Sequence, residues 1–346
     1  MHIEQFDPAT ASEARLRACH ELVISGQAVD DPNVPAVSFR RFRGWWTRGF
    51  AGIPQQIWLA SDDDGTLLGG YIMQLPDRDN RTNAFLDPFV GLTARRRGLG
   101  AELVAHAAGL ARQADRKLLM SGARVGSPGC DFAAAIGAKP GLDEVRRVLD
   151  VGPELHARLP GLRAEAEPHA AGYSIRTWIG LTPDDIIDSI AALNQAMADA
   201  PHDENVEPMN WDAERVRRED ERAVADGIAC YSVAAIDDTT GAAAALTQVY
   251  VDPDVTGWAW QGLTAVVREH RGHRLGMLVK VANLAWLAEA EPQIEHIVTF
   301  NAAPNQYMIA VNEQLGHRVS DVFRTFELDV EAALRLGARL GASILG

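Results

Sequence analysis

The chain has 346 residues, a net charge of -14 and a hydrophobic fraction of 47%, a composition typical of a folded protein with two domains. This acidity excludes a typical nucleic-acid-binding protein, which needs a basic surface to displace counterions. The sequence has no apolar run of about 18 residues and no metal-ligand spacing among its three cysteines, so we expect a cytoplasmic protein with no membrane span and no metal.

The first half of the chain predicts an alternation of strands and helices. A hairpin turn at residues 62–65 (Asp-Asp-Asp-Gly) separates two of the strands. The predicted strands cover residues 2–6, 56–61, 67–74, 84–92, 118–121 and 145–151, and the predicted helices cover 11–24, 37–50, 98–114 and 131–136.

The second half repeats this order, with a second hairpin turn at residues 237–241. Its predicted strands cover residues 173–178, 229–236, 243–251, 258–267, 296–300 and 319–328. Its predicted helices cover 184–198, 211–226, 275–288 and 305–315, and a final helix begins near 331. The proline-rich stretch between the halves predicts domains at 1–152 and 172–346, joined by a linker at 153–171.

Two basic bends, one in each half, are the most informative motifs. Each follows an apolar strand and precedes a long helix: residues 95–100 read Arg-Arg-Arg-Gly-Leu-Gly, and residues 271–276 read Arg-Gly-His-Arg-Leu-Gly. A helix that begins after such a bend offers unpaired N–H groups and a positive dipole end to an anion. The pattern therefore predicts two sites for a phosphorylated ligand.

This order of elements, with a basic bend after the fourth strand, resembles the GNAT superfamily of acyl-CoA-dependent N-acetyltransferases. The family motif is Arg or Gln, two residues, Gly, one residue, then Gly or Ala. Arg95, Gly98 and Gly100 match it fully. In the second copy Arg274 stands at the middle glycine, where an Arg can still be helical and leave the N–H groups in place. The resemblance implies an α/β (α+β) fold: two tandem GNAT domains, each with a mixed, mostly antiparallel sheet that splays between strands 4 and 5.

The second copy matches the family further. Its residues 299–301 (Thr-Phe-Asn), Asn305, Met308, Asn312 and Gly316 follow the pattern T-x-N…N-x-x-M-x-x-x-N-x-x-L-G, which in the family helps to hold the pantetheine arm. The first copy has no such asparagines. We therefore expect the second copy to carry the chemistry.

The resemblance implies acetyl-CoA as co-substrate, with its pyrophosphate on the bend and its thioester beside strand 4. The implied donor-binding residues are Val90, Arg95, Arg96, Arg97, Gly98, Leu99 and Gly100 in the first copy, and Val266, Val267, Arg271, Gly272, His273, Arg274, Leu275, Gly276, Met277, Asn301 and Asn305 in the second.

Direct attack by the acceptor amine requires a proton acceptor but no nucleophilic side chain. Candidate bases are Asp87 on the first copy's strand, a carboxylate of the acidic loop at 201–208 (Asp203, Glu204 or Glu207), or an ordered water. The family often protonates the departing thiolate with a tyrosine. Asn312 occupies that position in the second copy and Ala133 in the first, which leaves Tyr307 and Tyr250 as substitutes.

The resulting hypothesis is an N-acetyltransferase, a monomer or homodimer, that acts on a small cationic amine such as a basic antibiotic, as some actinobacterial two-domain members of the family do. Three alternatives stay open. One is acetylation of a cysteinyl amine, as in mycothiol synthase, another is a non-catalytic acyl-CoA sensor, and the third is N-terminal acetylation of proteins.

Overall fold

The computed structural model describes residues 1–196, 202–302 and 305–344, with side chains up to residue 337. The chain divides into two compact units. Unit 1 comprises Met1–Glu144, Asp203–Glu207 and Asp321–Gly346, and unit 2 comprises Val145–His202 and Pro208–Ser320. No helix of the described part is long and apolar enough to cross a membrane.

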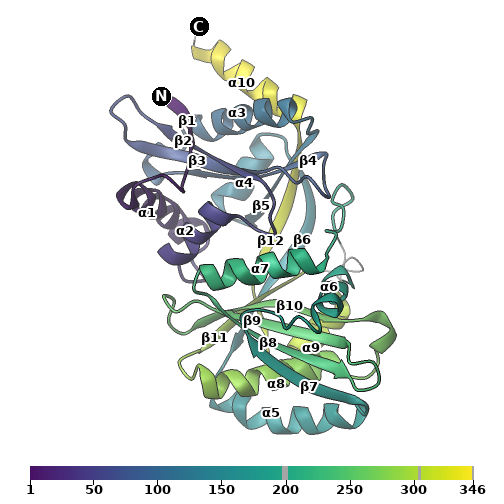
Figure 1. Ribbon diagram of the computed structural model, residues 1–346. Helices are drawn as coiled ribbons and strands as arrows, with labels where there is room; N and C mark the ends of the chain where they lie inside the picture. Colours follow the sequence, from purple (N-terminus) through teal and green to yellow (C-terminus); the bar gives the residue numbers. More distant parts are fainter. Residues whose placement is uncertain (197–201, 303–304, 345–346) are drawn as a thin grey trace. The chain divides into compact units, whose positions relative to one another are not determined.

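The elements of unit 1 follow the predicted order, and a central sheet has helices on both faces (Figure 1). Its strands run in the order β1-β2-β3-β4-β5-β12. They are β1 (His2–Phe6), β2 (Gln55–Ser61), β3 (Leu67–Gln74), β4 (Asn83–Val90), β5 (Leu118–Arg124) and β12 (Arg318–Asp329). Its helices are α1 (Glu13–Asp30), α2 (Phe39–Arg48), α3 (Leu99–Gln113), α4 (Pro128–Ala135) and α10 (Val330–Ile344).

Unit 2 repeats the arrangement with strand order β6-β11-β10-β9-β8-β7. Its strands are β6 (Lys139–Asp150), β7 (Tyr173–Ile179), β8 (Ala229–Asp237), β9 (Ala243–Val251), β10 (Trp258–Val266) and β11 (His296–Ala302). Its helices are α5 (Pro153–Ala166), α6 (Ile187–Gln195), α7 (Ala213–Ala225), α8 (Leu275–Ala290) and α9 (Gln306–Leu315). Residues 197 and 198, the end of the helix predicted at 184–198, lie outside the described residues.

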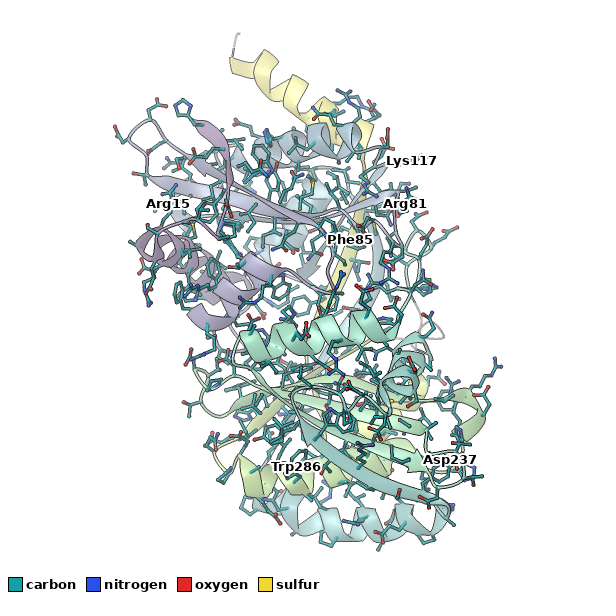
Figure 2. The ribbon with its side chains drawn as sticks, in the orientation of Figure 1. Arg15, Arg81, Phe85, Lys117, Asp237 and Trp286 are labelled. Carbon is teal, nitrogen blue, oxygen red and sulfur yellow. The ribbon has the colours of Figure 1, made fainter. Side chains whose placement is uncertain are left out.

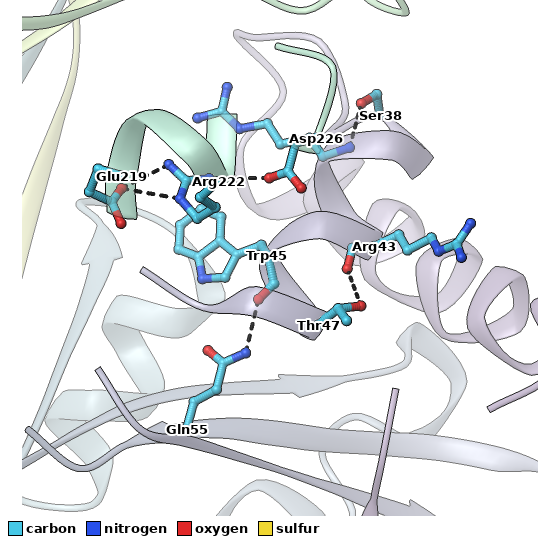
Figure 3. Close-up of polar contacts among 9 residues, drawn as sticks. Ser38, Arg43, Trp45, Thr47, Gln55, Glu219, Arg222 and Asp226 are labelled. Carbon is cyan, nitrogen blue, oxygen red and sulfur yellow. Dashed lines mark hydrogen bonds and ion pairs between the residues drawn. The ribbon is translucent and has the colours of Figure 1, made fainter. Parts of the chain in front are cut away.

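Each sheet separates two apolar clusters. In unit 1, Leu103 and Ala107 of α3 are fully buried against one face, and Phe42 and Trp46 of α2 pack with Cys19 of α1 on the other. The short helix α2 is further fixed by polar contacts to its backbone: the Gln55 side-chain amide donates to the carbonyl of Trp45 at 2.9 Å (Figure 3).

The last strand of each sequence repeat belongs to the unit formed by the other repeat. Strand β6 passes from unit 1 into unit 2 at Val145, and β12 passes from unit 2 into unit 1 at Asp321. The helices that follow are exchanged as well, because α5 packs on α8 while α10 packs on α3. The sequence repeats and the compact units therefore do not coincide.

The stretch expected to be a linker is largely helix α5. Its residues Leu155, Leu159 and Leu162 are buried in the main core of unit 2. Pro153 is accommodated in the first turn, where no intrahelical N–H is required. Helix α5 thus corresponds to α10, and both are regular parts of the architecture.

We predict that a chain ending at Ser320 destabilises unit 1, although the deletion lies in the C-terminal half. Strand β12 pairs antiparallel with β5 from Asp329↔Leu118 to Phe323↔Arg124, so the deletion exposes the whole edge of β5. Hydrogen exchange should show lost protection for the amides of residues 118–124 and retained protection in β8.

The variant Ala333→Asp tests the same point without a deletion, since Ala333 of α10 is fully buried in the core of unit 1. An unpaired carboxylate there should loosen unit 1 selectively. Unchanged protection of β5 in both proteins would contradict the exchange.

Candidate acyl-CoA site

The two parallel strand pairs separate after three residues. In unit 1, β4 and β5 pair from Asn83↔Leu118 to Phe85↔Met120, and in unit 2, β10 and β11 pair from Trp258↔His296 to Trp260↔Val298. Both strands of each pair continue for several residues beyond the last partner. The last paired residue of β4, Phe85, is labelled in Figure 2. The expected splay between strands 4 and 5 is therefore present in both units. It leaves main-chain groups of strand 4 unpaired by strand 5.

The basic bends adopt the same backbone path in both units. Each contains two left-handed residues: Arg96 (φ 63°) and Gly98 (φ 89°) in unit 1, and Gly272 (φ 90°) and Arg274 (φ 52°) in unit 2. The glycine has thus exchanged places with an arginine between the copies. The expectation that Arg274 would be helical is wrong, because it is the left-handed N-cap of α8. Left-handed backbone at a non-glycine residue costs about 1–2 kcal/mol.

Neither α3 nor α8 has a side-chain cap at its N-terminus. The N–H groups of the first turn are therefore not satisfied by a capping side chain, which suits a phosphate. The side chains of Leu99, Leu275 and Met277 are buried in the core, so these residues can offer a ligand only their main chain.

The first arginine of each motif points back toward its own strand. Arg95 donates to the carbonyl of Val90 at 3.0 Å and forms a two-point ion pair with Asp30 at 2.7–2.8 Å. Arg271 donates to the corresponding carbonyl of Val266 at 3.4 Å and is exposed. Arg95 thus braces its bend against α1, whereas Arg96, Arg97 and His273 have exposed side chains.

A β-bulge distinguishes unit 2. The pairing of β10 with β9 shifts register between Gln261 and Thr264, whereas β4 pairs with β3 without a shift. Gly262 is required within the bulge, because a Cβ there would lie 2.5 Å from the ring of Tyr250. Bulges re-aim main-chain groups and occur often beside active sites. Sequence reasoning missed this feature, for which Gly262 within an apolar strand was the signal.

Beside the bulge lies a buried polar network. Lys280 of α8 donates to the side-chain carbonyl of Gln261 at 2.9 Å, and the Gln261 amide donates to the hydroxyl of Thr247 at 3.0 Å. Burial lowers the pKa of Lys280 to about 7. Gln261 is the first residue beyond the parallel pairing, so the network sits at the point where β10 and β11 part.

The asparagines of the second copy join α9 to β11. The Asn312 amide donates to the side-chain carbonyl of Asn301 at 2.7 Å, and Asn312 is fully buried. Asn305 instead caps α9 by accepting from the N–H of Met308 at 3.4 Å. Asn312 therefore positions the helix, and its amide has no acid to offer a thiolate.

The four catalytic candidates do not share a unit. Asp203 and Glu204 belong to unit 1, where Asp203 accepts from the Leu142 N–H at 2.6 Å. Asn312 and Tyr307 belong to unit 2, and the Tyr307 side chain is 90% exposed.

Two other candidates can be placed. Asp87 lies on β4 with its side chain open to solvent, but crowding by surrounding protein atoms raises its pKa. Tyr250 lies beside the bulge, and its pKa is raised chiefly by burial and then by the neighbouring Cys230.

Comparisons with known proteins support the same architecture. No family model and no curated protein matches the sequence. Among solved structures, a tandem GNAT protein from the clavulanic acid biosynthesis pathway is 27% identical, with a TM-score of 0.76 over 95% of this chain and 98% of that one.

Two more distant structures share the fold. A GCN5-related N-acetyltransferase from Sphaerobacter thermophilus is 14% identical, with a TM-score of 0.63 over 95% of both chains. Saccharomyces cerevisiae N-myristoyltransferase, solved with myristoyl-CoA, is 11% identical, with a TM-score of 0.63 over 95% of this chain and 80% of that one.

We predict that Lys280→Met stabilises the protein most below pH 7. The amine of the unfolded chain binds a proton up to its ordinary pKa of 10.5, while the folded amine releases it near 7. Between these values the wild-type stability rises with pH by up to about 1.4 kcal/mol per unit, so the advantage of Met shrinks. Urea denaturation from pH 6 to 10 measures this difference.

Lys139→Met is the matched control, because the Lys139 side chain is 81% exposed. Its stability difference from the wild type should stay nearly constant over the same range. A constant difference for Lys280→Met as well would show that this amine is not buried as described.

Proposed function

Because the chain has the tandem GNAT architecture of N-acetyltransferases, we propose that unit 2 transfers the acetyl group of acetyl-CoA directly to the primary amine of a small cationic molecule. The observation that carries this assignment is the bulge at Gln261, beside the divergence of β10 and β11. Unit 1 shares the divergence and the uncapped helix, but its strand 4 pairs regularly.

The donor would be held chiefly by main-chain groups. The uncapped first turn of α8, from Leu275 to Met277, suits the pyrophosphate, with exposed Arg271 and His273 beside it. Main-chain N–H groups of β10 near the bulge suit the pantetheine arm and the thioester carbonyl, where negative charge develops during attack. Asn301 lies on the opposite strand, β11, and its side chain is held by the Asn312 amide.

The reaction is a direct acyl transfer. The amine nitrogen attacks the thioester carbon, the new C–N bond forms, and the C–S bond breaks. The amine loses one proton to water or to a carboxylate, and the thiolate takes up one proton. A thiolate with a pKa near 8.5 can leave without a dedicated acid. This fits the exposure of Tyr307 and the amide at Asn312.

The proposed acceptor rests on charge and on the tandem relative. The net charge of -14 attracts cations. The tandem GNAT protein it resembles belongs to the biosynthesis pathway of clavulanic acid, which favours a metabolite over a protein as the acceptor. Within the acidic loop, however, Asp203 accepts a hydrogen bond from the Leu142 N–H and Glu207 accepts one from the Asn80 N–H. The attraction of a cationic acceptor therefore depends mainly on the overall charge of the protein.

We predict that Gly276→Glu and Asn301→Ala abolish turnover. A Cβ at Gly276 meets Val266 at an ordinary 3.6 Å, so the fold tolerates the change while the new carboxylate repels the phosphates. Gly100→Glu is the corresponding change in unit 1 and should spare activity, although the Phe132 ring, 3.2 Å from a Cβ at Gly100, has to shift slightly. It is a cleaner control than Gly98→Glu, where φ is 89° and any side chain adds strain. Release of CoA thiol measures turnover, and the reverse pattern would move the active site to unit 1.

We further predict that turnover of a polycationic acceptor falls steeply with ionic strength, because screening removes long-range attraction. Aminoglycosides, basic cyclic peptides and polyamines should be screened against cysteinyl sugars, with kcat/KM measured at two salt concentrations. Exclusive turnover of a near-neutral cysteinyl amine would select the mycothiol-synthase-like alternative. Tight CoA binding without thiol release from any amine would select the sensor.

A further inference from the structure

The two units differ systematically around the point where their parallel strands part. The positions that correspond in sequence or register are apolar in unit 1: Leu86, Val104, Ala133, Ala138 and Phe326. In unit 2 they are Gln261, Lys280, Asn312, His317 and Arg147. Phe326 follows Gly316 at the same spacing as Arg147 follows Gly137, so the exchanged strand supplies the last residue of each set. A concerted change from apolar to polar residues inside a core needs a physical reason, because each buried polar group must be satisfied.

Two buried basic side chains in this set have no anionic partner among the described residues. Lys280 is 2% exposed and Arg147 is 6% exposed. Among the residues that the structure describes, Lys280 has only Gln261 as a hydrogen-bond partner, and the Nη1 atom of Arg147 has none. A buried cation without a counter-charge is strongly destabilising. An anion bound beside these two basic groups would supply the counter-charge that they lack.

Further unsatisfied atoms surround these cations. The Oδ1 atom of Asn312 and the Nε2 atom of His317 are buried without a partner in the described part of the chain. His317 bonds the carbonyl of Asn312 through Nδ1 at 3.0 Å, and both Lys280 and Arg147 act electrostatically on its ring. Burial, with a smaller effect from these charges, lowers the pKa of His317 to about 3, so the ring is neutral. Asn312, His317, Lys280 and Arg147 thus belong to one buried polar cluster around the His317 ring.

The location identifies which part of a ligand would reach the cluster. Gln261 follows the last parallel pair, Trp260↔Val298, and β10 runs from there to the bend at Arg271. A donor with its pyrophosphate on the bend therefore directs its acyl end toward Lys280.

We propose that unit 2 selects an acyl-CoA whose acyl chain ends in a carboxylate, with Lys280 and Arg147 binding that carboxylate. This inference rests on the proposed function, since it requires unit 2 to transfer an acyl group from CoA to an amine, and it changes the preferred acyl group from acetyl to one that carries a carboxylate. Transfer then forms an amide that carries a free acid, and CoA leaves as the thiol. Acetyl-CoA fits the same site but brings no carboxylate to Lys280 and Arg147, so it is the poorer donor.

Binding provides a test that does not depend on the acceptor. Succinyl-CoA and butyryl-CoA have acyl chains of similar length and differ in the terminal charge. By titration calorimetry, succinyl-CoA should bind about 10- to 100-fold more tightly, as expected for charge-assisted hydrogen bonds. At pH 8 its binding should take up a proton, measured from the heat in buffers of different ionisation enthalpy, because the anion restores the charge of Lys280. Butyryl-CoA should take up none.

Variants distinguish loss of carboxylate binding by the cluster from loss of the fold or of CoA binding as a whole. Lys280→Met and Arg147→Met should each remove most of the preference for succinyl-CoA and retain butyryl-CoA binding, which also shows that the variant is folded. The control Lys139→Met should keep the preference. Equal binding of both thioesters by the wild type would overturn the inference while leaving acyl transfer intact. Absence of binding by any CoA thioester would instead overturn the proposed function.

Discussion

The separation of two parallel strands after three residue pairs is the constraint on which the candidate site depends. A parallel ladder that continued to the end of β10 would satisfy its main-chain groups internally and leave no room for a ligand. Because the ladder stops at Trp260, the rest of β10 is held on one side only, by β9. The bend, the uncapped helix and the polar cluster can reach a ligand only because the strands separate here.

The two copies show how one architecture can diverge in chemistry without a change in topology. Their bends follow the same backbone path although Arg and Gly have exchanged places, so the path is imposed by the flanking strand and helix. Their interiors differ more. Unit 1 has the buried apolar side chain of Val104 at the position where unit 2 has the buried amine of Lys280. Unit 1 thus gains stability from burial, whereas the buried polar groups of unit 2 reduce its stability.

Sequence patterns were sufficient for both bends and for the order of elements, with the exception of helix α5. Alternation, hairpin turns and the Gly-marked helix starts are local signals, and the structure confirms the tandem fold that they predict. The sequence could not predict that β6 and α5 pack in unit 2. Periodicity shows which face of an element is buried, but it does not show which partner covers that face. Pro153 and Pro160 indicated a linker, while the helical spacing of Leu155, Leu159 and Leu162 was the stronger signal. Nothing local distinguishes a left-handed arginine such as Arg274 from a helical one.

The exchange of terminal strands also sets an order of events during synthesis. Strand β5 of unit 1 is made before any strand of unit 2, but its neighbour β12 leaves the ribosome after all of them. Unit 2, by contrast, has all its strands once residue 302 has emerged. The N-terminal part of the chain must therefore wait, with an open sheet edge, until β12 has emerged. Long sequence separation between paired strands slows folding, so the unit that is synthesised first is expected to be the one that matures last.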